Sequence, residues 1–221
     1  DVTGNVRTIR SVPLRIDELR PVEVRGEVFY TKKAFEKLNA AREEAGEPVF
    51  ANPRNAASGT IRLLDSRITA KRGLQACLYS MIAAPEVPAT QAQTLQRLSA
   101  FGFPVNPHWK PCESFDEVRG FVDHWRTARA DLDFETDGVV IKVDSRDLQK
   151  RLGSTAKSPR WSLAYKYPAE DKTTLVRDIS VQVGRTGGLT PVAHFDPILL
   201  AGTTVRRATL HGAQLPVFQA D

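Results

Sequence analysis

The sequence predicts an α+β fold that gives way to an all-β segment. Segments with helical periodicity and segments with strand alternation follow one another up to about Pro168. Beyond that residue the pattern becomes rich in strands. Because helices and sheets bury their apolar faces in different kinds of layer, this change marks a domain boundary, which we expect near residues 168–176. The predicted domains are 1–170 and 171–221.

The first strand is expected at Val22 to Tyr30, where apolar and polar residues alternate. Thr31 is a suitable N-cap for the helix that follows, because its hydroxyl can accept from a backbone N–H of the first turn. Gly46 and Pro48 should end that helix.

The next elements alternate in type. Asn52 to Asn55 has the composition of a turn, with proline fixing φ and asparagine making local backbone bonds. A short helix is expected from Ala56 to Leu64 and a buried strand from Gly73 to Met81. The apolar spacing in Gln91 to Phe101 predicts another helix.

The last elements of the first domain carry clearer signals. Ser114 followed by Glu117 forms a capping box that should open a helix. Asp137-Gly138 is a turn signal ahead of the β-prone run Val139 to Val143. Trp161 to Tyr167 predicts a further strand.

The second domain is expected to contain strands only. From Leu175, two strands flank the glycine-rich turn Gly184 to Gly188. A further strand pair is predicted within Thr203 to Leu210.

Composition narrows the function classes. The net charge of +5 permits a polyanionic partner such as nucleic acid, although charge alone is weak support. No apolar run approaches the roughly 18 residues that a membrane span needs. Cys77 and Cys112 lie far apart and form no Cys-x-x-Cys pair, so the sequence offers no zinc site and favours two buried thiols.

Lys142 and Lys166 each lie inside a hydrophobic strand segment. A single such lysine is usually an edge residue or one whose ammonium reaches solvent. Two of them suggest a phosphate site if their side chains converge, since each ammonium offers a point charge and three donors.

Glu27 and Asp137 are carboxylates on or beside predicted strands. Pairing with neighbouring arginines such as Arg25 is the ordinary interpretation. The functional alternative is an acidic edge that binds a ribose hydroxyl or Mg²⁺, which prefers oxygen ligands. Together with two lysines, these carboxylates would suit nucleotidyl transfer, which needs the phosphate charge neutralised.

Several arginines are candidate anion-binding residues, although most arginines are simply solvated. Arg54 is the most suggestive, because it lies just before an expected helix start, where anions bind well. Arg62 and Arg129 are less distinctive. The Gly184 to Gly188 turn is either an ordinary hairpin or one that lies along a nucleic-acid backbone, with Arg185, Arg206 and Arg207 contacting phosphates.

Several blocks of the chain resemble motifs of the bacterial NAD-dependent DNA ligases. Their order and spacing agree with that family from residue 1 to about 211. The resemblance implies a nucleotidyltransferase core with antiparallel sheets, followed by part of a five-stranded oligonucleotide-binding (OB) barrel. The blocks are Val24–Phe29, Phe50–Arg62, Asp137–Val143, Pro159–Pro168, Val183–Gly187 and Ala208–His211.

The resemblance also implies a reaction. A lysine attacks the α-phosphorus of NAD and expels nicotinamide mononucleotide, AMP passes to the 5′-phosphate of a nick, and the 3′-hydroxyl then displaces AMP. The implied cofactors are NAD and Mg²⁺, the partner is nicked double-stranded DNA, and the enzyme is a cytoplasmic monomer. By resemblance the catalytic residues are Asp137, Lys142 and Lys166; Glu27, Arg54, Arg129 and both lysines bind the cofactor; Arg62, Arg185, Arg206 and Arg207 bind DNA; and Glu27 and Asp137 hold the metal.

The chain also departs from the family pattern. The nucleophile of the family lies in a Lys-x-Asp-Gly motif, and none of the lysines here stands in one. We therefore expect a fragment that cannot adenylate itself, with zinc bound only in other parts of the parent enzyme. Two alternatives remain: a non-catalytic nucleotide- or DNA-binding remnant, and a relative that uses ATP or GTP, against which the Phe50 to Arg62 block argues.

Overall fold

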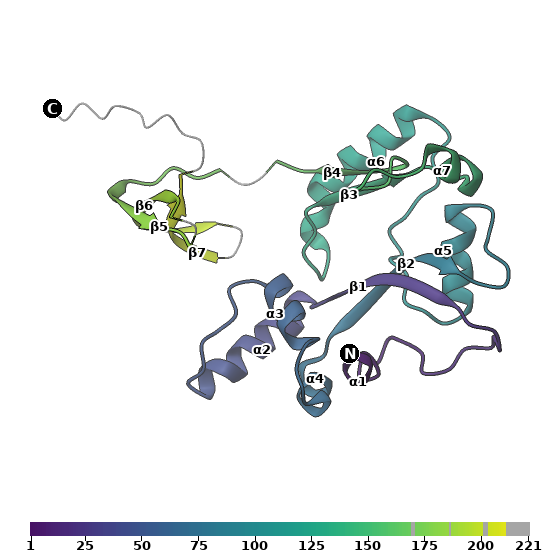
Figure 1. Cartoon of the computed structure of the whole chain (residues 1–221), viewed down its shortest axis with the longest axis horizontal. Helices are drawn as coiled ribbons and strands as arrows, with labels where there is room; N and C mark the ends of the chain where they lie inside the picture. The colour runs from purple at the N-terminus through teal and green to yellow at the C-terminus, as the bar shows by residue number, and fades with distance from the viewer. Residues whose placement is uncertain (169–170, 186, 201–202, 211–221) are drawn as a thin grey trace. The chain divides into compact units, whose positions relative to one another are not determined.

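The computed structural model describes residues 1–168, 171–185, 187–200 and 203–210. Helices and antiparallel sheets are mixed, which confirms the α+β class (Figure 1). Contacts divide the chain into two compact units, Asp1–Tyr167 and Pro168–Asp221. The elements are α1 (Thr3–Val6), β1 (Glu23–Phe29), α2 (Lys32–Glu44), α3 (Pro53–Thr60), α4 (Ser66–Arg72), β2 (Gln75–Ala83), α5 (Gln91–Ala100), α6 (Phe115–Ala128), the 3₁₀ turn η1 (Arg129–Asp131), β3 (Gly138–Lys142), α7 (Arg146–Leu152), β4 (Ser162–Lys166), β5 (Val176–Val183), β6 (Leu189–Leu200) and β7 (Thr203–Thr209).

The first sheet of unit 1 pairs β1 with β2 in antiparallel fashion. Its register places Glu27 opposite Cys77. The register then steps from Arg25–Ser80 to Gly26–Leu78, so Tyr79 is the extra residue of a bulge. A bulge bends the strand and changes the direction of its side chain. This irregularity therefore sets the direction of the Tyr79 side chain.

The core of unit 1 lies where α2 and α3 meet this sheet. The Thr31 hydroxyl accepts from the Ala34 N–H at 3.2 Å, which confirms the predicted N-cap of α2. Leu38 is the buried residue of that helix. The buried apolar side chains of this cluster are Ile9, Tyr30, Leu38, Ala56, Ala57, Leu74 and Ala76.

Helix α3 differs from the prediction. It begins at Pro53 and ends at Thr60, instead of running from Ala56 to Leu64. The reason is local, because proline is favoured in the first helical turn and the Asn52 side chain accepts from the Asn55 N–H at 2.8 Å. The segment predicted as a turn is thus the helix start, and Arg54 lies inside its first turn.

Three short helices were not predicted: α1, α4 and α7. They have four or seven residues, too few for a clear apolar periodicity. Two of them carry caps that are recognisable in the sequence. Asp65 accepts from the Arg67 N–H at 2.9 Å and Ser145 from the Leu148 N–H at 3.4 Å.

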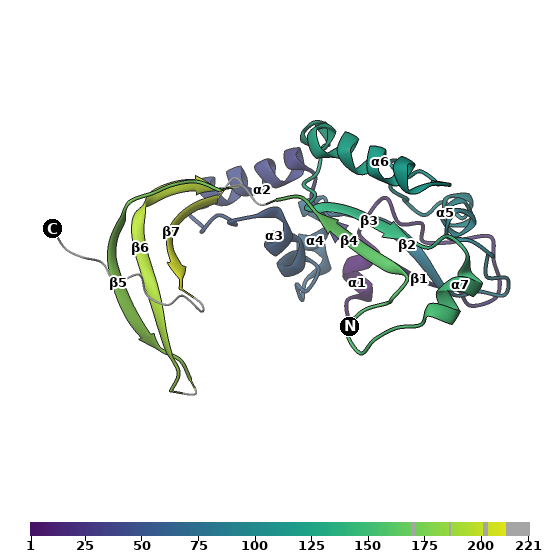
Figure 2. The same cartoon turned by 90° about the horizontal axis from the view of Figure 1, so that it is seen from above.

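The second sheet of unit 1 pairs β3 with β4, with Gly138 opposite Lys166 and Lys142 opposite Ser162. Figure 2 shows α6 beside this pair, and the Tyr167 hydroxyl donates to the Val122 carbonyl of α6 at 2.8 Å. Ser114 caps α6 as predicted, accepting from the Glu117 N–H at 3.2 Å.

The described residues of unit 2 form a three-stranded antiparallel meander in the order β5-β6-β7. The predicted glycine-rich hairpin is present, with Gly187 at φ 81° and its N–H donating to the Gly184 carbonyl at 2.9 Å. The strand pair predicted within Thr203 to Leu210 is wrong, because that segment is the single strand β7 and finds its partner in β6. His211 and the tail 212–221 lie outside the described residues.

Candidate functional site

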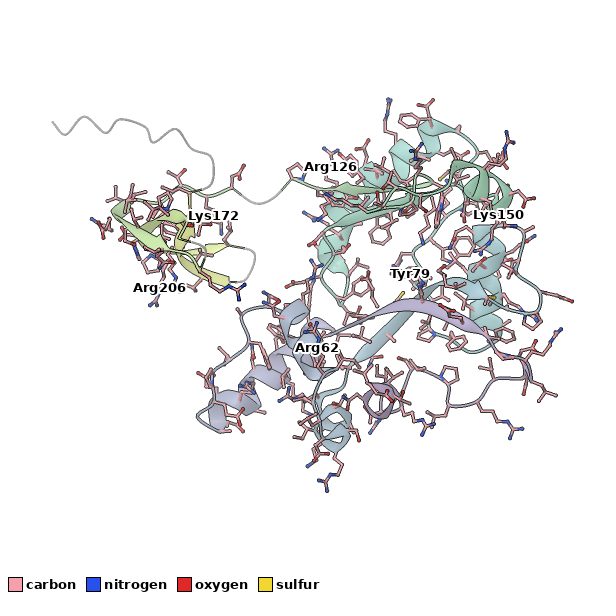
Figure 3. The ribbon with its side chains drawn as sticks, in the orientation of Figure 1. Arg62, Tyr79, Arg126, Lys150, Lys172 and Arg206 are labelled. Atoms are coloured by element: carbon pink, nitrogen blue, oxygen red, sulfur yellow. The ribbon has the colours of Figure 1, made fainter. Side chains whose placement is uncertain are left out.

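Lys142 connects the two sheets of unit 1. It is the last residue of β3 and is half-buried. Its Nζ lies 4.6 Å from the centroid of the Tyr79 ring on β2, the range of a cation–π contact. Tyr79 is labelled in Figure 3. The lysine is therefore held over an aromatic face instead of extending freely into solvent.

Glu27 belongs to the same group of side chains. Burial lowers the pKa of Lys142, and the charges of Cys77 and Glu27 oppose that shift. The pKa of Tyr79 is raised by burial first and by Glu27 second. Burial likewise raises the pKa of the Cys77 thiol. One carboxylate, one ammonium and one aromatic ring thus lie within electrostatic reach of one another.

Lys166 shares a face with Lys142 but lies farther along the sheet. Cross-strand partners point to the same side, and the partner of Lys166 is Gly138, four positions before Lys142. At 3.3–3.4 Å per residue, Gly138 and Lys142 are about 13 Å apart along β3, so the backbone of Lys166 is at least that far from the backbone of Lys142. Lys166 is exposed. The two lysines line one face without forming a single cluster.

Arg54 and Asp137 are brought together from separate segments. Arg54 Nη1 lies 3.9 Å from Asp137 Oδ2, and their side chains are 87% and 76% exposed. An ion pair that is this exposed to solvent contributes little to stability. Either partner is therefore available to a ligand at small cost.

Arg129 contacts the turn that carries Asp137. Its guanidinium is 4.6 Å from the centroid of the Tyr167 ring, and Nη1 donates to the Thr136 carbonyl at 3.3 Å. The Tyr167 N–H donates to the Asp137 carbonyl at 3.1 Å. The contacts of Arg129 therefore support the turn and the adjoining ends of β3 and β4.

The predicted DNA-binding arginines occupy exposed positions. Arg62 follows α3 in unit 1 and is labelled in Figure 3. Arg185 lies in the β5–β6 hairpin turn. Arg206 and Arg207 are adjacent on β7, so they point to opposite faces of the strand, with Arg207 opposite His194.

Within the described parts of the chain, no group of three or more His, Cys, Asp or Glu side chains is arranged to hold a metal ion. Magnesium is often held by only one or two carboxylates together with substrate phosphates. The carboxylates of Glu27 and Asp137 suit that role in type.

Tyr79 and Cys77 are site residues that sequence reasoning missed. Both lie in a strand whose residues are almost all apolar, so the alternation that separates a site face from a core face is absent. The bulge and the second sheet make them neighbours of Glu27 and Lys142. One usable signal was an aromatic hydroxyl within an otherwise apolar strand.

Comparison with known proteins identifies the family. The family model of the NAD-dependent DNA ligase adenylation domain matches residues 1–170, and that of the NAD-dependent DNA ligase OB-fold domain matches residues 173–215. Among curated relatives named DNA ligase, that of Halalkalibacterium halodurans is 51% identical over 217 residues, covering 97% of this chain. Those of Oceanobacillus iheyensis and Solibacter usitatus are 50% identical over 216 residues and 51% over 214, covering 97% and 96% of it.

The chain spans 32% of the length of each of these relatives. Among the described residues no helix is both long and apolar enough to cross a membrane. The family matches follow the chain in the same order as the predicted domains, with the adenylation domain first and the OB-fold domain second. The chain therefore belongs to the NAD-dependent DNA ligase family and is a fragment of such an enzyme.

Proposed function

We propose that the protein from which this chain comes seals nicks in duplex DNA, with NAD as the AMP donor and through enzyme-adenylate and DNA-adenylate intermediates. The chain's share of this work is to hold the adenylate. The observation that carries the proposal is the group formed by Lys142, Tyr79 and Glu27. It offers a ring for a base, a cation for a phosphate and a carboxylate for a ribose hydroxyl.

The roles follow from the chemistry of each side chain. Lys142 neutralises the phosphate, and its partial burial strengthens that interaction because the local dielectric is low. The Tyr79 ring gives the adenine a stacking surface. Glu27 accepts hydrogen bonds from the ribose hydroxyls. Lys166, on the same face, meets the phosphate from farther along the sheet.

Asp137 and Arg54 act at the other end of this face. Arg54 exchanges its exposed carboxylate partner, 3.9 Å away, for a phosphate, which a guanidinium can bind through two parallel hydrogen bonds. Arg129 keeps the Asp137 turn in place. When bound, Mg²⁺ would neutralise phosphate charge, with Glu27 or Asp137 supplying a carboxylate ligand.

DNA contacts fall to the exposed arginines of both units. We expect Arg62, Arg185 and one of the adjacent pair Arg206 and Arg207 to contact phosphates, which fix the position of a protein on a duplex without reading its sequence. Release of counterions from the duplex makes such binding strongly dependent on salt.

The calorimetric test of the nucleotide site compares two lysines. AMP binding should be measured for the unmodified chain, for Lys142→Ala and for the control Lys150→Ala. Lys150 is an exposed lysine of α7, labelled well apart from Tyr79 in Figure 3. We expect weak binding that Lys142→Ala reduces roughly 10- to 100-fold, the worth of one hydrogen bond to a charged group. Binding that is indifferent to Lys142→Ala refutes the site.

The chain alone should not become adenylated, because none of its lysines stands in a Lys-x-Asp-Gly motif. Intact-mass measurement after incubation with NAD and Mg²⁺ should show an unchanged mass. A gain of one AMP would show that a residue outside such a motif serves as the nucleophile.

A further inference from the structure

Asn5 holds the backbone on both sides of Arg62. The Asn5 side chain belongs to α1 and is only 4% exposed. Its Nδ2 donates to the Ile61 carbonyl at 2.9 Å and to the Leu63 carbonyl at 2.6 Å. Both protons of one buried amide are thus committed to the two residues that flank Arg62.

A second layer of buried hydrogen bonds holds Asn5 itself. The Thr69 hydroxyl lies 3.1 Å from Asn5 Oδ1 and 3.2 Å from the Thr60 carbonyl. The Thr60 hydroxyl accepts from the Tyr30 hydroxyl and from Arg72 Nη1, both at 3.0 Å. Thr60 and Thr69 are 0% and 1% exposed. Buried networks whose members are all satisfied make the surrounding structure rigid.

The backbone N–H groups of the clamped segment are held by α3, with Arg62 N–H donating to the Gly59 carbonyl at 3.3 Å and Leu63 N–H to the Thr60 carbonyl at 3.2 Å, whereas its carbonyls depend on Asn5. Ile61 is the C-cap of α3, and the last carbonyls of a helix lack partners within the helix. Arg62 and Leu64 on either side of Leu63 are exposed, Leu64 fully so. Without Asn5 the carbonyls of Ile61 and Leu63 would turn to water, and the backbone at Arg62 would be held only by the N–H bonds of Arg62 and Leu63 to α3.

We propose that Asn5 is a positioning residue for nick binding, which fixes the backbone of Arg62 so that its guanidinium is presented to a DNA phosphate. This inference rests on the DNA-binding role proposed for Arg62. A long arginine side chain already loses rotamer freedom when it binds. Fixing its backbone in advance removes a further ordering cost from the binding step.

The test is a double-mutant cycle on DNA binding by the full 221-residue chain. The probe is a fluorescent duplex with one nick that carries a 5′-phosphate, titrated at several salt concentrations. The variants are Arg62→Ala, Asn5→Ala and the double variant. Asn5→Asp is a second clamp variant, because it keeps the shape of the side chain and loses both donated bonds.

The matched control is Thr8→Val. The Thr8 hydroxyl donates to the Asn5 backbone carbonyl at 2.7 Å, so the variant loses a side-chain bond next to α1 and keeps both bonds that the Asn5 side chain donates. AMP binding by each variant reports folding at the nucleotide site. A purely structural role for Asn5 would weaken AMP and DNA binding together.

We expect Arg62→Ala and Asn5→Ala each to weaken binding and to lower the salt slope by about 0.9, the value for one lost phosphate contact. The double variant should bind no more weakly than Arg62→Ala, since both changes remove one contact. Thr8→Val should leave the salt slope unchanged, and AMP affinity should stay constant throughout.

Three results would overturn the proposal. One is an additive double variant, and another is a loss of AMP affinity that parallels the loss of DNA affinity in both Asn5 variants. The third is an Arg62→Ala variant with unchanged DNA binding, which would also remove the proposed DNA role of Arg62. The first two leave that role standing, so the two failures are distinguishable.

Discussion

Gly138→Ala should separate the two strands that carry the candidate site lysines. Gly138 faces Lys166 across the β3–β4 pair. A Cβ at position 138 would overlap the Tyr165 carbonyl oxygen and lie 2.9 Å from both Lys166 Cα and the Tyr165 carbonyl carbon. All these atoms belong to backbone, so no side-chain rotation relieves the overlap. The strands must move apart at the point where Asp137 and Lys166 lie.

The loss of stability in Gly138→Ala can be calculated from the separation of β3 and β4 that the added methyl group requires. Forcing a methyl group into a packed region costs about 1–3 kcal/mol. Parting the strands at this pair weakens one or two ladder hydrogen bonds, worth about 1 kcal/mol each. We therefore expect the free energy of unfolding of Gly138→Ala to be lower by about 2–5 kcal/mol. At about 2–4 °C per kcal/mol for a chain of this size, Tm should fall by roughly 4–20 °C.

Thermal unfolding followed by circular dichroism measures this effect, with Gly120→Ala as the matched control. Gly120 lies in α6, and a Cβ there would meet nothing within 4 Å. Alanine is favoured over glycine inside a helix by about 1 kcal/mol, so this variant should be more stable than the unmodified chain. Gly138→Ala with an unchanged Tm, or Gly120→Ala as damaging as Gly138→Ala, would refute the reasoning.

Further predictions concern charge and support. Burial lowers the pKa of Lys142 below 10.5, so AMP affinity measured by calorimetry should already fall as the pH rises toward that value. Lys142→Arg should bind AMP with an affinity that does not change over the same pH range, because arginine stays charged. An AMP affinity of the unmodified chain that does not change with pH would contradict this prediction. Arg129→Met loses the contact with Tyr167 and one hydrogen bond, so the free energy of unfolding measured in urea should fall by about 1–3 kcal/mol. An unchanged free energy of unfolding would show that these contacts do not stabilise the fold. Arg206 and Arg207 point to opposite faces of β7, so only one of the two alanine variants should lower the salt slope of DNA binding by about 0.9; equal effects would argue against a single DNA-facing side.

Sequence reasoning succeeded where a few neighbouring residues decide the outcome. The caps at Thr31 and Ser114 were predicted and are present. At Asn52 the composition predicts a turn, whereas the side chain caps the start of α3 and proline follows it in the first helical turn. The assignment of β7 failed for another reason. A strand's partner is not encoded in its own residues, and β7 pairs with β6 through a bulged register.

The candidate site also has features that local sequence predicts and features that only long-range contacts create. The sequence by itself determined the residue types, the order of the motifs and the helix starts, because these depend on side chains within a turn of each other. Only the tertiary structure decided that Lys142 lies over Tyr79, that Arg54 reaches Asp137 and that Asn5 clamps Arg62. Each of these contacts joins segments distant in the chain. They depend on strand register, one bulge and the packing of separate elements, which no local pattern specifies.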